Sequence, residues 1–270
     1  MKGNLRKMVT ENTQPVTYSL PIGESFVALN DFIDKKISLT FTGTINCIAC
    51  GRVTSKSFQQ GYCFPCMRSL AECDTCIVKP ELCHFDQGTC RDAEWGQTHC
   101  MQDHYVYLSN TSGVKVGITR HTQIPTRWID QGATQALPIF KVSSRKTSGL
   151  LEVIIKNHVA DKTDWRKMLK GNSDDIDLQG KRDDLVAECN KEIDKLKKSL
   201  SADAIQYLEK EKETAIEFPV LEFPEKVTSL NFDKTENISG ILRGIKGQYL
   251  ILDCGVLNIR KFGGYEIEFD

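Results

Sequence analysis

Short alternating runs of apolar and polar residues occupy both ends of the chain. Near the start they lie at residues 16–20, 26–29 and 37–43. Near the end they lie at residues 216–218, 220–223, 240–245, 248–252, 256–260 and 265–269. Such runs, separated by glycine, proline and asparagine, are typical of antiparallel strands. Because the runs are short and evenly spaced, we predict a small barrel-like β module that combines the strands of residues 1–46 with those of residues 215–270.

The centre of the chain has a different pattern. Apolar runs at residues 105–108 and 114–118 flank a turn-forming stretch, which predicts a β-hairpin. The elements predicted after the hairpin are a helix opened by Arg127 and Trp128, a strand at residues 136–142 and a helix at residues 148–159. We therefore expect a small αβ core at residues 105–170.

Residues 181–212 are rich in Lys, Glu, Leu and Ala, and their apolar positions recur at helical intervals. The recurring positions are Leu185, Cys189, Ile193, Leu196 and Leu200. Ser201 has the chemistry of a helix N-cap and would start a second helix that contains Ile205 and Leu208. We predict a helical hairpin at residues 171–214 that packs on the core, with Cys189 on its buried stripe.

The sequence contains 11 cysteines, and nine of them lie between residues 47 and 100. Cys47-Ile-Ala-Cys50 and Cys63-Phe-Pro-Cys66 have the spacing of a zinc ribbon, in which each pair holds one edge of a tetrahedral ion. Four thiolates leave no open position for a substrate, so we expect this zinc to be structural. Because residues 47–104 contain few apolar side chains, bound metal would supply much of their folding energy.

The second group of cysteines is less regular. Its members are Cys73, Cys76, Cys83, Cys90 and Cys100, with His84, His99 and His104 among them or close by. Five thiols exceed one tetrahedral site, so at least one is spare, or histidine helps to hold two ions. Cys73 and Cys76 form a natural first half with Cys90 and Cys100 as partners, and Cys83 or His104 can replace either. We predict a second zinc site, with an iron–sulfur cluster as the alternative.

The charge of the chain is unevenly placed. The totals, a net charge of −1 and 40% hydrophobic residues, describe an ordinary soluble protein. Without an apolar run of membrane-spanning length or a hydrophobic signal core, we expect a cytoplasmic protein with reduced cysteines. Residues 115–166, however, hold nine Lys/Arg and four Asp/Glu, which makes this segment +5 and the remainder −6. Such a local cationic face favours a polyanion as partner.

The core carries a family resemblance. Tyr105-Val-Tyr107, Lys115-Val-Gly117, Arg127-Trp128 and Glu152 follow the order of the GIY-YIG nuclease superfamily, in which two motif-bearing strands precede a helix arginine and a later helix glutamate. The resemblance implies phosphodiester hydrolysis, with Mg²⁺ or Mn²⁺ at Glu152, a phosphate clamp at Arg127 and a water-positioning hydroxyl at Tyr107. Two positions depart from the pattern, because Tyr105 replaces the first-motif glycine and Lys115 replaces the second-motif tyrosine.

Five further motifs are spread along the chain: Gly61-Tyr-Cys63, Pro80-Glu-Leu-Cys-His84, Gly88-Thr-Cys-Arg91, Arg127-Trp-Ile-Asp-Gln-Gly-Ala133 and Gly244-Ile-Lys-Gly-Gln-Tyr-Leu-Ile251. Through these motifs nearly the whole chain resembles an uncharacterised bacterial family, domain of unknown function 2797. That resemblance implies no activity.

Together these patterns predict an α+β protein, with a GIY-YIG-like core preceded by a zinc region at residues 47–104 and flanked by the β module. The phosphate-binding residues that we predict are Lys115, Arg120, Arg127 and Arg145. They suit the holding of phosphate better than its cleavage, so our first hypothesis is a zinc-stabilised DNA- or RNA-binding protein with weak or no catalysis.

Two alternatives remain open. One is a divalent-metal-dependent endonuclease that uses Tyr107, Arg127 and Glu152, and the other is a zinc-ribbon scaffold for protein interactions. The same residues also permit structural roles. Glu152 and Arg127 can form a salt bridge, and the two tyrosines can cap the core.

Overall fold

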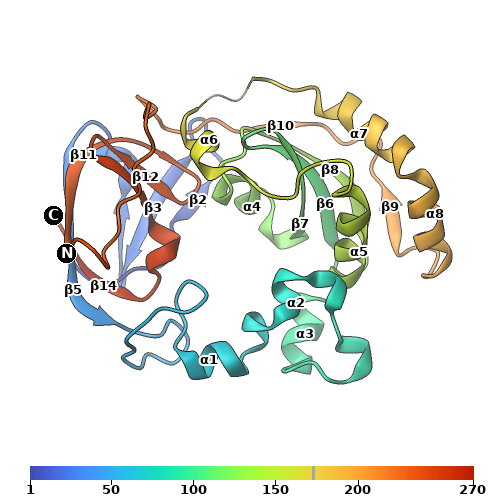
Figure 1. The fold of residues 1–270 in the computed structure, drawn as a ribbon, viewed down its shortest axis with the longest axis horizontal. Helices are drawn as coiled ribbons and strands as arrows, with labels where there is room; N and C mark the ends of the chain where they lie inside the picture. The colour runs from blue at the N-terminus through green and yellow to red at the C-terminus, as the bar shows by residue number, and fades with distance from the viewer. Residues whose placement is uncertain (172–173) are drawn as a thin grey trace.

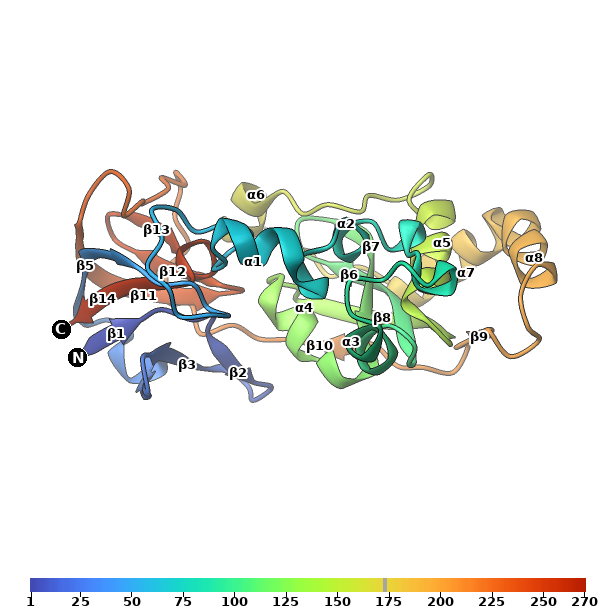
Figure 2. The same ribbon diagram turned by 90° about the horizontal axis from the view of Figure 1, so that it is seen from below.

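The computed structural model describes residues 1–171 and 174–270 of the chain. Two units built on β-sheets lie at opposite ends of the molecule (Figure 1). We call the unit that contains both chain ends the β module, and the unit formed by residues 104–215 the αβ core. The cysteine-rich segment, residues 47–103, runs from one unit to the other as a series of short helices (Figure 2).

The β module joins the two ends of the chain in one six-stranded sheet. Its strand order is β1-β14-β5-β11-β12-β13. The strands are β1 Lys2–Asn4, β5 Lys36–Ile45, β11 Asn237–Lys246, β12 Tyr249–Leu252, β13 Gly255–Asn258 and β14 Tyr265–Phe269. Because β5 pairs antiparallel with both β11 and β14, an N-terminal strand lies between two C-terminal strands.

The predicted barrel is wrong, because the six-stranded sheet has β1 and β13 as open edges and the described residues form no closed barrel. A separate three-stranded sheet packs against it instead, formed by β2 Val9–Glu11, β3 Thr17–Ile22 and β4 Ser25–Ala28. Leu20 of the small sheet and Leu39 and Ile267 of the large one are fully buried in a common core. Two stacked sheets bury their apolar faces against each other, so closure is not needed.

The strands predicted at residues 216–218 and 220–223 are also wrong. Only Thr214–Ala215 (β10) is a strand here, and Val220 forms an isolated bridge to Gly244. Pro219 and Pro224 explain the failure, because proline has no N–H to donate to a strand ladder.

The αβ core is built on a five-stranded sheet with the order β10-β8-β6-β7, in which β9 also pairs with β8. Its other strands are β6 His104–Asn110, β7 Val114–Arg120, β8 Gln135–Val142 and β9 Ile205–Tyr207. Its helices are α4 Thr126–Asp130, α5 Arg145–Ile155, α6 Trp165–Leu169, α7 Leu178–Glu188 and α8 Asn190–Lys198. The predicted hairpin is confirmed, because β6 and β7 pair along their whole length.

Alternation along β6 divides its side chains between two cores. Val106 and Leu108 belong to the core that also contains buried residues of α5, α7 and α8. Tyr107 points the other way, toward Trp128 of α4, and belongs to the core of the β module. The two units therefore share buried surface through one face of the central strand.

The predicted helical hairpin is only partly present. Helices α7 and α8 meet at Cys189, which is fully buried. The second helix that we predicted from Ser201 is wrong, because Ile205–Tyr207 forms strand β9 on the edge of β8. Pairing with an exposed strand edge outweighed the local helical pattern. Residues 172 and 173, at the start of the predicted hairpin, lie outside the described residues.

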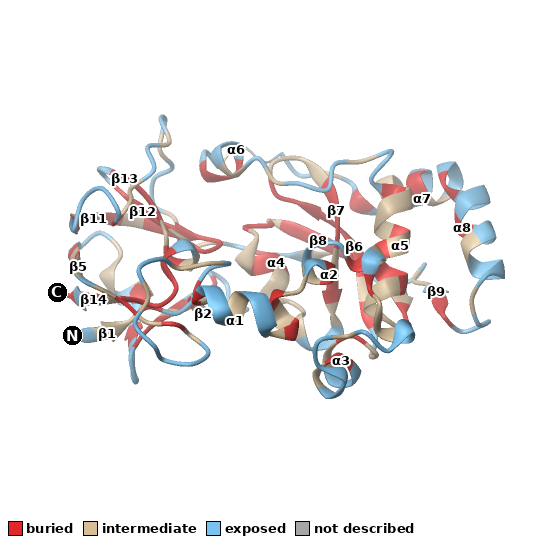
Figure 3. Cartoon of the chain, turned by 60° about the horizontal axis from the view of Figure 1, so that its bottom comes forward, coloured by how far each residue is buried: buried red, intermediate tan, exposed pale blue. Residues whose placement is uncertain are grey.

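The cysteine-rich segment has almost no apolar interior of its own. Its helices are α1 Phe64–Ser69, α2 Thr75–Val78 and α3 Ala93–His99, joined by 3-10 turns and loops. Much of its surface is exposed (Figure 3). The buried apolar side chains of residues 47–103 are Ala71, Pro80, Cys47, Cys63, Cys73, Cys76, Cys83 and Cys100. Thiols thus take the place that aliphatic side chains have in an ordinary core.

Candidate metal centre and phosphate site

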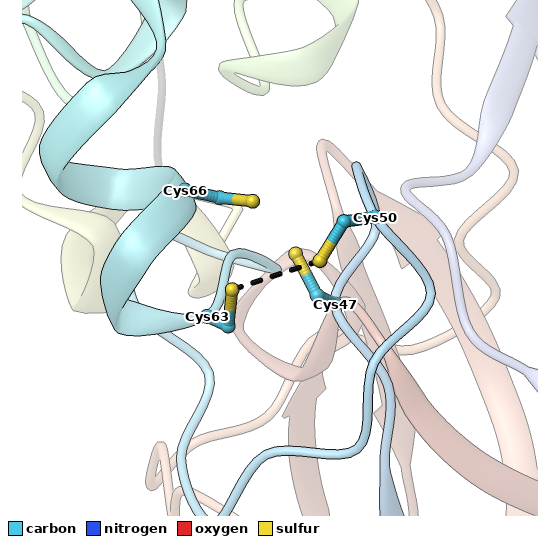
Figure 4. A group of neighbouring side chains, drawn as sticks. All are labelled: Cys47, Cys50, Cys63 and Cys66. Carbon is cyan, nitrogen blue, oxygen red and sulfur yellow. Dashed lines mark hydrogen bonds between the residues drawn. The ribbon is translucent and has the colours of Figure 1, made fainter.

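Four cysteines meet where the cysteine-rich segment leaves the β module. Cys47 and Cys50 lie on the turn that follows β5, and Cys63 and Cys66 lie at the start of α1. Their four Sγ atoms all lie within 4.8 Å of one another, and those of Cys50 and Cys63 are 3.8 Å apart (Figure 4). A tetrahedral zinc ion with Zn–S bonds of about 2.3 Å requires sulfur atoms about 3.8 Å apart. The cluster fits such an ion.

Backbone amides favour the thiolate form of Cys47, whereas hydrogen bonds with Cys63 and Cys50 raise the pKa of Cys66. Burial raises the pKa of the Cys47 thiol, but hydrogen bonds from the backbone N–H groups of Cys50, Cys63 and Ala49 outweigh burial and lower the pKa to about 6. The thiolate is the form that binds metal. With four protein ligands the site is closed, which suits a structural ion and leaves no position for a reacting water.

Glycines let this metal centre dock against the β module. A Cβ at Gly263 would overlap the carbonyl oxygen of Gln60, and one at Gly264 would overlap that of Asn46. The Ser57 hydroxyl donates to the Gly263 carbonyl at 3.0 Å, and the Asn46 N–H donates to the Gly264 carbonyl at 2.8 Å. The metal centre therefore packs directly on the turn that leads into β14.

The second group of cysteines separates into two parts. Cys76, Cys83, Cys90 and Cys100 line one cavity of about 10 Å³ beneath α3. Cys73 does not line this cavity. His104 lies at the start of β6, where its ring Nδ1 is 2.8 Å from the carbonyl oxygen of Gln102. Asp74, Cys76 and His84 form a second group of donor atoms within 4.8 Å of one another.

The residues predicted for catalysis, Tyr107, Arg127 and Glu152, lie near one of the predicted phosphate ligands, Lys115. Tyr107 lies on β6, Lys115 on β7, Arg127 on α4 and Glu152 on α5. They lie close enough for Arg127 to shift the pKa of Tyr107, Lys115 and Glu152. The segment that follows α5 runs beside β7, where Val116 N–H donates to the Ala160 carbonyl at 2.8 Å, and it brings Asp161 to the same place. We call Lys115, Arg127, Glu152 and Asp161 the charged cluster.

Lys115 is the most constrained member of the charged cluster, with 4% of its surface exposed. Burial and, to a smaller extent, the charge of Arg127 together lower its pKa to about 8, against the opposing effect of Glu152 and Asp161. Burial also raises the pKa of Glu152, and the neighbouring charge of Asp161 raises it as well. Lys115 is buried and Arg127 and Glu152 are half-buried, so their charges interact more strongly than in water, whereas Asp161 is exposed.

Tyr107 is fully buried behind the charged cluster. It faces Gly117 across the hairpin, where a Cβ would lie 2.7 Å from the phenol oxygen. Only glycine leaves room for the ring at this position. The hydroxyl donates to Oε1 of Gln131 at 2.9 Å. Sequence analysis missed Gln131, although it stands four residues after Arg127 and so on the same face of α4.

Two other predicted phosphate ligands face the cysteine-rich segment. Arg145 at the start of α5 donates from Nη2 to the Ile77 carbonyl at 2.6 Å. Both Arg145 and Arg120 act to lower the pKa of the Cys100 thiol, against the larger effect of burial.

Asp130 at the end of α4 connects this helix to the β module, because its carboxylate accepts hydrogen bonds from Lys7 at 2.9 Å and from Gln248 at 2.8 Å.

Comparison with known proteins identifies the family of the chain. The model of the family described as "Protein of unknown function (DUF2797)" matches residues 34–267, so the chain belongs to this family. No curated protein and no solved structure matches the chain. None of the described helices is both long enough and apolar enough to cross a membrane.

We predict that Cys63→Ser removes one zinc ion per chain and lowers the melting temperature by about 10 °C or more, because the metal supplies folding energy that the segment lacks. Elemental analysis and calorimetry on the purified chain measure both effects. Cys254→Ser is the control, since Cys254 is exposed and distant in sequence from the cluster. Equal zinc content in the two variants would contradict a Cys47–Cys66 site.

We also predict that Lys115→Met stabilises the fold below pH 8 by on the order of 1–3 kcal/mol. The pKa of Lys115 is about 8 in the folded chain and near its ordinary value of 10.5 when unfolded. Between these values the unfolded chain binds more protons, so the stability of the wild type rises with pH and the advantage of the variant shrinks. Urea denaturation from pH 6 to 10 measures the difference.

Lys246→Met is a matched comparison for Lys115→Met. Burial lowers the pKa of Lys246 to about 8 as well, so the pH dependence should be similar. Lys198→Met, on the exposed end of α8, should show none. A Lys115→Met variant whose advantage does not change across this pH range would show that Lys115 is not a poorly solvated cation.

Proposed function

We propose that the chain is a zinc-stabilised nucleic-acid-binding protein that holds phosphate between Lys115 and Arg127. The observation that carries this proposal is the buried position of Lys115 beside a second cation. A buried charge costs free energy unless an opposite charge compensates it. Among the described residues, neither Lys115 nor Arg127 forms an ion pair within 4.0 Å, so a bound anion would compensate both.

Other cations near Arg127 favour a ligand with more than one phosphate. Arg127 lowers the pKa of Arg145 and also that of Arg260, in each case after the larger effect of burial. Arg260 belongs to the β module and lines a cavity of about 260 Å³. Arg6 and Lys7 line the same cavity, and no acidic residue does. A nucleic-acid strand carries regularly spaced phosphates, so one phosphate can contact Lys115 and Arg127 while another contacts the cations of this cavity.

The order of elements in the αβ core supports the resemblance to GIY-YIG nucleases. A hairpin, the Arg127 helix, a third strand and the Glu152 helix follow one another, and Tyr107 pairs with Gly117 across the hairpin. The glutamate and Asp161 would be the ligands of a divalent cation, which would polarise a phosphate. This arrangement favours a phosphodiester endonuclease as the second candidate.

Two features favour binding over cleavage. The hydroxyl of Tyr107 is buried and donates to Gln131, so it has no contact with solvent from which to position a water. Lys115 replaces the tyrosine of the second motif, and at neutral pH a lysine with a pKa of about 8 is mainly protonated. A protonated amine anchors phosphate and does not accept a proton.

We predict that the wild type binds fluorescently labelled DNA or RNA with an affinity that falls as salt concentration rises. Arg127→Glu should weaken binding at least about tenfold and make the salt dependence shallower, because a phosphate contact is lost. Lys198→Glu makes the same charge change on α8 and should bind like the wild type. Fluorescence anisotropy over a salt series gives both quantities.

Equal affinities for Arg127→Glu and Lys198→Glu would contradict the phosphate site. Affinity independent of salt would contradict nucleic-acid binding as a whole. If affinity purification instead recovered a protein partner after nuclease treatment, the interaction scaffold would replace both nucleic-acid proposals.

We expect no cleavage of plasmid DNA or RNA above the buffer control with Mg²⁺ or Mn²⁺, because Lys115 occupies the position of the second-motif tyrosine of GIY-YIG nucleases. Gel analysis over a time course provides the measurement. Nicking by the wild type that Glu152→Gln abolishes, with an unchanged circular dichroism spectrum, would establish the endonuclease in place of the binding protein.

A further inference from the structure

We propose that Cys76, Cys83, Cys90 and Cys100 hold a second structural zinc ion. Cys76 lies in α2, Cys83 and Cys100 directly follow the 3-10 turn Pro80–Leu82 and α3, and Cys90 lies in a loop, yet all four line one cavity of about 10 Å³. That volume is about the size of a single small atom or water molecule. Cys76 lies beside Cys83 and Cys100, and Cys100 lies beside Cys83 and Cys90.

Binding would draw the four sulfur atoms inward. Unlike those of the first site, they do not all lie within 4.8 Å of one another. The Cys90 thiol donates to the Asp92 carbonyl at 3.2 Å. Cys90 lies in a loop between a 3-10 turn and α3, so rotation of its side chain can redirect the sulfur without moving a helix.

Asp74 and His84 are placed to surround and orient the cysteine ligands of this ion, and we do not count them as ligands themselves. Asp74 accepts a hydrogen bond from the backbone N–H of Cys76 and forms an ion pair with Arg91 at 2.7 Å. The ring of His84 lies between the Asp74 carboxylate, 3.6 Å from Nε2, and the Thr89 hydroxyl, 2.8 Å from Nδ1. These polar groups already have partners, which is typical of the groups that surround and orient metal ligands.

Cations offset the charge of such a site. Four thiolates around Zn²⁺ carry a net charge of −2. Arg145 interacts electrostatically with Cys100 and Cys76, and its backbone N–H donates to the Cys100 carbonyl at 2.8 Å. Its buried Nε has no hydrogen-bond partner among the described residues. A cluster of thiolates would give this guanidinium its missing counter-charge.

The second ion would fix the cysteine-rich segment to the αβ core. The 3-10 turn Pro80–Leu82 lies between Cys76 and Cys83 and packs on α5. At Gly149 of α5 a Cβ would lie 2.6 Å from the backbone nitrogen of Glu81. Lys146, one turn earlier, forms an ion pair with Asp86 at 3.0 Å. The same helix carries Glu152, so the ion would help to position the charged cluster.

The test is a count of zinc ions in the intact, full-length chain by native mass spectrometry. We expect two ions in the wild type and one in both Cys83→Ser and Cys90→Ser. Cys73→Ser is the matched control, because Cys73 is buried in the same segment but lies outside the cavity. It should retain two ions, as should Asp74→Asn and His84→Gln.

One zinc ion in the wild type would overturn the proposal. It would also fail if Cys73→Ser lost an ion, or if Asp74→Asn lost one while Cys90→Ser kept two. Iron and inorganic sulfide in place of zinc would identify a cluster of another kind. Because Cys90 is only half-buried, its serine variant should fold, and cobalt substitution reports the number of thiolate ligands independently of stability. None of these outcomes depends on nucleic-acid binding.

Discussion

The structure depends on how a segment with almost no aliphatic core is held in shape. Apart from Ala71 and Pro80, the buried apolar side chains of residues 47–103 are cysteines. Short helices of four to seven residues are not stable by themselves, so contacts with other elements or with metal must fix them. A thiolate–metal bond supplies in a few atoms what hydrophobic burial would supply only over a large area. A metal ion held by Cys47, Cys50, Cys63 and Cys66 would therefore be the constraint on which the remaining arrangement rests.

That segment contacts both sheet units, and in both places a glycine permits the close approach of its backbone. Gly263 and Gly264 admit the first metal centre against the β module, and Gly149 admits the turn before Cys83 against α5. Helix α4 is held from the β module as well, because Asp130 accepts hydrogen bonds from Lys7 and Gln248. Within the charged cluster, Arg127 therefore lies on a helix that the β module holds in place, and Glu152 lies on a helix that the cysteine-rich segment contacts. Its geometry depends on the docking of the whole chain.

Local patterns predicted those parts of the molecule that neighbouring residues determine. The alternation at residues 105–118 predicted the hairpin, and the spacing Cys-x-x-Cys predicted a cluster whose sulfur atoms lie within 4.8 Å of one another. The predictions failed where distant segments decide the outcome. Residues 205–207 have a helical pattern but form a strand that pairs with the edge of β8. Where we predicted a barrel, two separate sheets pack against each other. The spacing of the cysteines also does not say which loops meet, so it could not sort the five cysteines of the second group or place Arg145 near Cys76 and Cys100.

The most direct test of this account is hydrogen–deuterium exchange on the full-length chain before and after zinc is removed with a chelator. The account predicts faster exchange throughout residues 47–103 and in α5, whose docking depends on that segment, while the paired strands β5, β11 and β14 remain protected. Unchanged exchange in residues 47–103 after complete loss of zinc would contradict it, because the segment would then hold its shape without metal.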